Sequence, residues 1–410
     1  MLRKNTDVSI QSPALQYLSL VSARLAAIRK DVPKLVKMGE KMAELLIEGG
    51  EIFTPDVAPF WPSEFCDRAG GMMGVRKGME WAKSSKNFAY FAVPNPKTWR
   101  PKEDKKFKEL IDSKAKLFVV GRPEDLAGAA PASRFAGFTG GADPDAGLYG
   151  TPERRPLAGL REFEQFVRAW ITAGEMIAAC TRAGKIPIIW MSVWLEGALV
   201  RNGHFFLHDN LHEPWHTPVF HDKHYVPPMD AGYVSGAFLD EAERIHRRLI
   251  DQAGELATAG QWLAQAKKNG RRIWTVAVGH SYPVLLELPS DPDAYPMRWG
   301  PSFSDLKIAV PAEYKDGDVA LHFGYAPVDN ADVKLLLKRG LRLIHTSPYG
   351  NSVSPVKDKN FLYFDLPWRP ADATVDVPGY SVRILPMSST AQSMSLFAIM
   401  AEMAERMGWS

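Results

Sequence analysis

Histidine residues are clustered in one short stretch of this sequence. Six of the ten histidines, with Asp and Glu residues between them, stand within 21 residues: His204, His208, His212, His216, His221 and His224. Imidazole and carboxylate together suit zinc or another transition metal. The first four are spaced by four residues, which on a helix would align them on one face. This pattern makes His204, His208, His212 and His216 a candidate site for a divalent metal.

Two other interpretations of this stretch stay open. Asn210, Pro214 and Pro218 disfavour one continuous helix, so the stretch can be a loop rich in Trp and His that packs over a sheet. It can also complete a sugar pocket, because aromatic and imidazole rings stack on sugar faces. Neither interpretation needs a metal, and no other part of the sequence requires a cofactor.

The second chemical feature is a strand that runs into a small polar loop. Residues 271–281 read RRIWTVAVGHS, and their apolar run is typical of a strand buried on both faces. Gly279 permits a sharp turn, which leaves His280 and Ser281 at the carboxyl end of the strand. Ligands bind at that end in open α/β sheets.

Further hydroxyl groups stand at the ends of other predicted strands. Thr346, Ser347 and Ser352 follow a strand in the second half, and Ser192 is the counterpart of Ser347 in the first half. These hydroxyls could hold a ligand. The alternative is ordinary turn chemistry, in which a serine bonds its own backbone.

Composition limits the class of protein. A chain of 410 residues with 46% hydrophobic and 24% charged residues suits two globular domains. A net charge of +3 gives no electrostatic case for nucleic acid, and no stretch reaches the about 18 apolar residues of a membrane span. Cys66 and Cys180 provide neither a disulfide framework nor a cysteine zinc site. We therefore expect a cytoplasmic protein that binds neither nucleic acid nor membranes.

Apolar periodicity predicts helices and strands in alternation. In the first half we expect helices over 13–48, divided at Pro33, and over 160–182, with strands over 51–54, 87–93, 115–121 and 186–191. In the second half we expect helices over 235–269, 329–339 and 388–407, the last with Ser388 or Ser389 as N-cap. The strands expected there are 271–278, 306–310, 318–323, 341–346, 361–366, 373–377 and 381–385.

The two halves repeat this order of elements. The segment AACTRAGKIPIIWMSVW in the first half parallels LLLKRGLRLIHTSPYG in the second. Tandem duplication is the simplest account. We predict two tandem three-layer α-β-α domains, residues 1–228 and 229–410, each with a mostly parallel sheet flanked by helices.

At this point the sequence resembles the SIS (sugar isomerase) family of phosphosugar-binding domains, as two copies over most of the chain. Similar bacterial proteins carry a Gly-His-Ser loop, a glutamate soon after it and an Arg-Ala-Gly-Gly ending. Here Gly279-His280-Ser281 and Glu287 stand in the second half, while Glu64 and Arg68-Ala69-Gly70-Gly71 stand in the first. The pattern is thus divided between the copies, which predicts one composite site between them.

The resemblance implies aldose–ketose isomerisation of a sugar or sugar phosphate through an enediol. By motif match, Glu64 and Glu287 take the position of the base, and His280 that of the ring-opening or polarising group. The alternative is that both glutamates are surface residues. Some ligand-binding residues are implied by the motif match and others are predicted from their position at strand ends. Together they are Arg68, Ser192, Gly279, Ser281, Gly324, Thr346, Ser347 and Ser352.

The sequence also departs from the family pattern. Family phosphate loops supply Ser and Thr hydroxyls, whereas residues 322–326 read HFGYA and keep only Gly324. The comparable place in the first half has Gly121-Arg122-Pro123, where Arg122 could hold a phosphate. This loss favours the alternative of a non-catalytic sugar-phosphate sensor. SIS domains work in pairs, which a tandem chain supplies internally, so both a monomer and a homodimer stay open.

Overall fold

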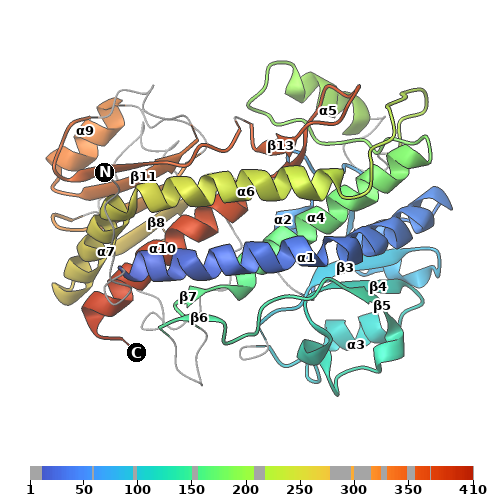
Figure 1. Cartoon of the computed structure of the whole chain (residues 1–410), viewed down its shortest axis with the longest axis horizontal. Helices are drawn as coiled ribbons and strands as arrows, with labels where there is room; N and C mark the ends of the chain where they lie inside the picture. Colours follow the sequence, from blue (N-terminus) through green and yellow to red (C-terminus); the bar gives the residue numbers. More distant parts are fainter. Residues whose placement is uncertain are drawn as a thin grey trace, which may run out of the picture.

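Two five-stranded parallel sheets form the framework of the chain (Figure 1). The computed structural model describes residues 12–57, 60–95, 99–149, 156–206, 218–277, 297–299, 315–324, 330–348, 356–369 and 371–409. Both sheets are flanked by helices, as the sequence predicted. Among the described residues, no helix has the length and apolar character needed to cross a membrane.

The two sheets share one strand order. The first has the order β2-β1-β3-β4-β5, from β1 (Ile52–Thr54), β2 (Arg76–Lys77), β3 (Phe88–Ala92), β4 (Lys116–Val120) and β5 (Phe135–Phe138). The second has the order β12-β11-β10-β8-β9, from β8 (Ile273–Ala277), β9 (Met297–Trp299), β10 (Val319–Phe323), β11 (Arg342–Ser347) and β12 (Phe361–Asp365). In each sheet the order reverses between the first and third strands along the chain. Ligands bind beside such a reversal, at the carboxyl ends of the strands.

Helices and two small antiparallel strand pairs make up the rest of the regular structure in the described residues. The α-helices are α1 (Pro13–Ile47), α2 (Phe60–Phe65), α3 (Lys105–Asp112), α4 (Arg161–Arg182), α5 (Ala198–Phe206), α6 (Tyr233–Asp251), α7 (Ala253–Lys268), α9 (Asn330–Lys338) and α10 (Ser388–Met407). Short 3-10 helices are η2 (Glu80–Lys83), η3 (Pro123–Leu126) and η4 (Ala132–Arg134). The antiparallel pairs are β6 (Gly147–Leu148) with β7 (Ala158–Gly159), and β13 (Ala373–Val375) with β14 (Ile384–Pro386).

Long helices connect the two sheets. Figure 1 shows α1 and α6 running lengthwise across the molecule, and α1 packs against α4, α6 and α10. One hydrophobic core contains residues of both sheets and of these helices. At Gly260, α7 approaches α10 so closely that a Cβ atom would lie 2.3 Å from Cβ of Glu402. Glycine at this position therefore permits the close packing of α7 on α10.

Two helix predictions were wrong in detail. Pro33 does not divide the first helix, because α1 continues through it. The lost hydrogen bond is outweighed by burial on both sides, as at Ile28 and Leu35. The predicted helix over 235–269 is instead two helices that break at Gln252. The Gln252 side chain donates to the backbone oxygen of Asp365 at 3.0 Å and accepts from its N–H at 3.0 Å, so the break joins the helices to β12.

One strand prediction needs similar correction. Residues 186–191 belong to neither sheet and form isolated antiparallel bridges, Met72 with Ile189 and Pro187 with Phe220. Pro187 lacks the N–H that a central strand requires. The predicted strands over 373–377 and 381–385 pair with each other as β13 and β14. The predicted strand over 306–310 lies outside the described residues, and the domain boundary at 228 stays a prediction.

Candidate functional site

Glu64 and Arg68 of the first half lie inside the molecule. Glu64 belongs to α2, and Arg68 follows one helical turn later, so the two side chains meet as an i,i+4 ion pair. Asp67 has a φ of 55° and Gly70 a φ of 82°, and these left-handed residues turn the chain back at the end of α2. Both side chains of the ion pair are 0% exposed.

The Glu64 carboxylate is fully occupied by protein donors. Trp170 of α4 donates its indole N–H to Oε1 at 2.7 Å. Ser389 of α10 donates its hydroxyl to Oε2 at 2.9 Å, and Arg68 contacts the same oxygen. Burial raises the pKa of Glu64 to about 7, although Arg68 and the two neutral donors act in the opposite direction. Such a pKa suits a general base, but this carboxylate reaches no surface.

Arg68 connects the first half of the chain to the second. Its guanidinium donates to Ser388 Oγ at 2.5 Å, to Ser389 Oγ at 2.6 Å and to Asp372 Oδ2 at 3.3 Å. We call Glu64, Arg68, Asp372, Ser388 and Ser389 the central ionic cluster. It lies where α2 meets the first residues of α10, so Glu64 and Arg68 contact residues of the second half of the chain. The composite site itself stays a prediction.

The central ionic cluster also corrects the predicted N-cap of the last helix. Neither Ser388 nor Ser389 caps α10 with its side chain. Instead, Asp372 Oδ1 accepts from the N–H of Met387 at 3.1 Å and of Ser388 at 2.8 Å. Asp372 and Ala371 have φ values of 73° and 71°, a costly conformation that aims the carboxylate at the helix start.

Three predicted ligand-binding residues come together at the carboxyl edge of the second sheet. Gly324 follows β10, and its N–H donates to the backbone oxygen of Thr346 in β11 at 2.9 Å. Ser347 is the last residue of β11 and shares a 2.9 Å hydrogen bond with the hydroxyl of Tyr363. Thr346 is 0% exposed, and among the described residues its hydroxyl has no hydrogen-bond partner. This edge therefore contains a glycine and two hydroxyls, both of them buried.

A histidine pair that the sequence analysis did not single out lies on the same strands. His322 of β10 and His345 of β11 are register partners, and their Nδ1 atoms lie 2.6 Å apart. One ring must donate and the other accept, so the pair holds one proton between these nitrogens. Burial, and then the neighbouring imidazole, lowers the pKa of His322 well below its usual value. The signal in the sequence was weak, because these histidines are 23 residues apart on separate strands.

This histidine pair predicts acid sensitivity. An unfolded histidine binds a proton near pH 6.5, whereas folded His322 resists protonation to a lower pH. The stability that depends on neutral His322 is therefore complete above about pH 6.5 and is lost as the pH falls, at up to about 1.4 kcal/mol per pH unit. Denaturant titrations at several pH values should show this slope, and His322→Gln should reduce it. Equal pH dependence in both proteins would contradict the prediction.

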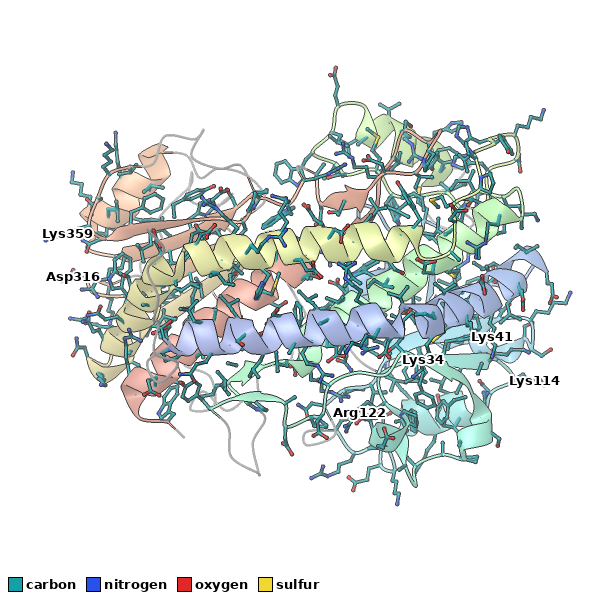
Figure 2. The ribbon with its side chains drawn as sticks, in the orientation of Figure 1. Lys34, Lys41, Lys114, Arg122, Asp316 and Lys359 are labelled. Carbon is teal, nitrogen blue, oxygen red and sulfur yellow. The ribbon has the colours of Figure 1, made fainter. Side chains whose placement is uncertain are left out.

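The carboxyl edge of the first sheet is filled by side chains of α4. Gln165 donates to the backbone oxygen of Val93 at 2.9 Å, and Arg161 donates to the same oxygen at 3.2 Å. Arg161 also pairs with Asp125 at 2.8 Å. Arg122, labelled in Figure 2, forms ion pairs with Asp125 and with exposed Asp143. Neither Arg161 nor Gln165 was predicted, because both fit an ordinary helical period.

Of the remaining predicted site residues, Ser192 is described by the structure and is not among the side chains gathered at these two places. Ser192 is 6% exposed and accepts a long 3.5 Å hydrogen bond from the N–H of Trp194, which is turn chemistry. Five residues lie outside the described part of the chain: Gly279, His280, Ser281, Glu287 and Ser352. Their predicted roles stay predictions.

The predicted metal cluster is only partly described. His204 is exposed on α5, and His208, His212 and His216 lie outside the described residues. Within the described ranges, no three His, Cys, Asp or Glu side chains are grouped to hold a metal ion. The metal site therefore stays a prediction.

Comparison with known proteins shows which solved structures have a similar fold. No protein-family model and no curated protein sequence matches the chain. The structure is similar to the C-terminal domain of glucosamine-fructose-6-phosphate aminotransferase from Francisella tularensis, with a TM-score of 0.52 and 10% identity over 99% of both chains. TM-scores of 0.43 and 0.45 relate it to candidate phosphosugar isomerases from Silicibacter pomeroyi (11% identity over 97% of this chain and 99% of that one) and Bacillus subtilis (14% over 95% and 96%). The first likeness establishes the fold alone, and the fold agrees with the tandem α/β architecture that the sequence motifs indicated.

Proposed function

We propose that this protein binds a sugar or sugar phosphate at the carboxyl edge of the second sheet and isomerises it between aldose and ketose. The observation that carries the proposal is the juxtaposition of Gly324, Thr346 and Ser347 at the ends of β10 and β11. Thr346 supports it most directly, because its buried hydroxyl lacks a partner in the described part of the chain. A ligand hydroxyl or phosphate oxygen would supply that partner.

The proposed chemistry is proton transfer between adjacent carbons. His280 opens the sugar ring or polarises its carbonyl, and a carboxylate removes the proton from the carbon next to the carbonyl. The resulting enediol takes the proton back on the former carbonyl carbon. Glu287 is the better base, because both oxygens of Glu64 are held by Trp170, Ser389 and Arg68. In that case the role of Glu64 is structural: it stabilises the contact between the two halves of the chain.

A non-catalytic sugar-phosphate sensor is the second candidate. It is favoured by the same occupied Glu64 carboxylate and by the loop at Gly324, which lacks the hydroxyls of a family phosphate loop. A ligand bound at a junction between two halves would bias their arrangement without any reaction. Binding and turnover must therefore be measured separately.

Ligand binding is tested by thermal unfolding with a panel of sugars and sugar phosphates. A true ligand at a hundredfold excess over its Kd adds about 2.7 kcal/mol, which for a chain of this length raises Tm by about 3 °C. Thr346→Val should lose the shift. Thr390→Val is the matched control, since Thr390 is also buried with a hydroxyl that lacks a partner among the described residues, but lies on α10. No shift with any compound would contradict both candidate functions.

Two further measurements separate the alternatives. Isomerisation in D2O places deuterium on the sugar carbon that receives the proton, whereas a sensor shifts Tm and leaves the sugar unlabelled. Repeating the unfolding in EDTA tests the metal prediction, because loss of a bound ion would lower Tm. A Tm that is unchanged by EDTA would count against the metal site at the histidine cluster.

A further inference from the structure

A group of large apolar side chains is exposed around α5. The exposed fractions are 61% for Val193, 54% for Trp194, 44% for Leu195, 72% for Leu199, 80% for Val200 and 72% for Tyr225. We call these six residues the α5 surface. Single exposed apolar residues are ordinary, but a contiguous group marks an interaction site.

Buried residues and hydrogen bonds fix α5, which carries this surface, to the rest of the protein. Ala198 is 1% and Asn202 6% exposed, and the Asn202 amide accepts from the N–H of Met191 at 3.1 Å and donates to its backbone oxygen at 2.7 Å. Arg201 donates to the backbone oxygen of Ile189 at 2.8 Å and to the hydroxyl of Tyr380 at 2.8 Å. The outward face of α5 is therefore presented in a fixed position, which lowers the entropic cost of docking.

Tyr380 joins the rest of the α5 surface to this helix. Its hydroxyl lies 2.9 Å from Nε2 of His221, and its ring packs 5.4 Å from the ring of His224, which precedes Tyr225. Figure 1 shows α5 at the margin of the molecule, near the β13 segment. None of the six residues lines a described pocket, so a partner would dock on an open face.

Charges around the α5 surface have both signs. Glu196, Asp222 and Lys223 are exposed and form no ion pair within the described part of the chain. A surface with apolar centre and both signs at its rim can pair with itself across a two-fold axis, where each acid faces a base. The six exposures amount to roughly 700 Å², close to the about 800 Å² per partner of a standard interface.

We propose that the α5 surface is covered by the α5 surface of a second copy of this chain, in a two-fold symmetric dimer. Leu199 and Val200, on α5 itself, are 72% and 80% exposed. The inference is independent of the proposed sugar chemistry, because none of its residues belongs to the carboxyl edge of the second sheet.

Sedimentation velocity of the full chain over a broad concentration range tests the dimer. The unchanged protein should be dimeric, and Leu199→Glu combined with Val200→Glu should weaken association by about a hundredfold or more. Leu335→Glu is the matched control, since Leu335 is 41% exposed on α9 and should leave the dimer intact. Circular dichroism and Tm verify that the variants are folded. An unchanged protein that is monomeric throughout, or a dimer that survives the double variant, would overturn the proposal.

Cross-linking locates the contact. Cys66 and Cys180 are buried, so an introduced cysteine is the accessible thiol. Val200→Cys should form a covalent dimer with a short bis-maleimide, and Leu335→Cys should not. Efficient cross-linking of the Leu335→Cys control with none at Val200→Cys would place any self-association elsewhere and refute the assignment.

Discussion

Arg68→Met is expected to lower the free energy of unfolding by about 3–5 kcal/mol at pH 8, the usual cost of removing one partner of a buried ion pair. The variant keeps the volume of the side chain but leaves the carboxylates of Glu64 and Asp372 without their cation. Denaturant titration followed by circular dichroism measures the loss. Arg29→Met is the control, since Arg29 pairs with Asp240 and Glu243 at the surface and should change stability by no more than about 1 kcal/mol.

The loss in Arg68→Met should grow with pH. A carboxyl whose pKa is raised in the folded state, here to about 7 for Glu64, adds stability that is complete below its unfolded pKa and is lost as the pH rises through 7. Removing Arg68 removes an interaction that lowers this pKa, so ionising Glu64 costs more folding free energy in the variant. The difference between variant and original protein should therefore be smaller at pH 5.5 than at pH 8. A difference that is independent of pH would show that Glu64 is not the group responsible.

Glu287→Gln is expected to lower turnover by about 10²–10⁴-fold, the usual contribution of a general base, once a substrate has been found. Glutamine keeps the shape of glutamate but cannot accept the proton, so binding measured by Tm shift should persist. Glu243→Gln, on the surface of α6, is the control and should leave turnover unchanged.

Glu64→Gln distinguishes the two candidate bases. Because the Glu64 carboxylate is held inside the central ionic cluster, this variant should lower Tm. Loss of turnover in Glu64→Gln at unchanged Tm, with normal turnover in Glu287→Gln, would reverse the assignment of the base.

Most of the strands could be predicted because burial on both faces requires a continuous run of apolar residues. Residues 88–92 read FAYFA and are all buried, as are 319–323, and such runs are typical of strands in the middle of a covered sheet. The run at 186–191 is also apolar, yet it forms bridges with Met72 and Phe220 outside both sheets. Composition alone cannot identify which backbone a strand will pair with. β5, which contains Gly137 and is only half-buried, was missed for the converse reason.

Only part of the central ionic cluster, Glu64 and Arg68, could be predicted from the sequence. The spacing of Glu64 and Arg68 permits their pairing on one helical face, and the motif drew attention to both. Their partners Ser388 and Asp372 are more than 300 residues away, and Trp170 sits in an ordinary apolar stripe. No local rule links such positions, so the sequence could indicate that the two residues matter but not that they are sealed inside.

The same distance has a consequence for synthesis on the ribosome. Arg68 and its partner Ser388 are separated by 320 residues. At about 5–20 residues per second, roughly 15–60 s pass between the emergence of the two. Throughout that interval the first half carries a guanidinium and a carboxylate whose partners on α10 have not yet been synthesised. The nascent first half therefore has to keep these charges in water, and its final closure waits for α10 to arrive.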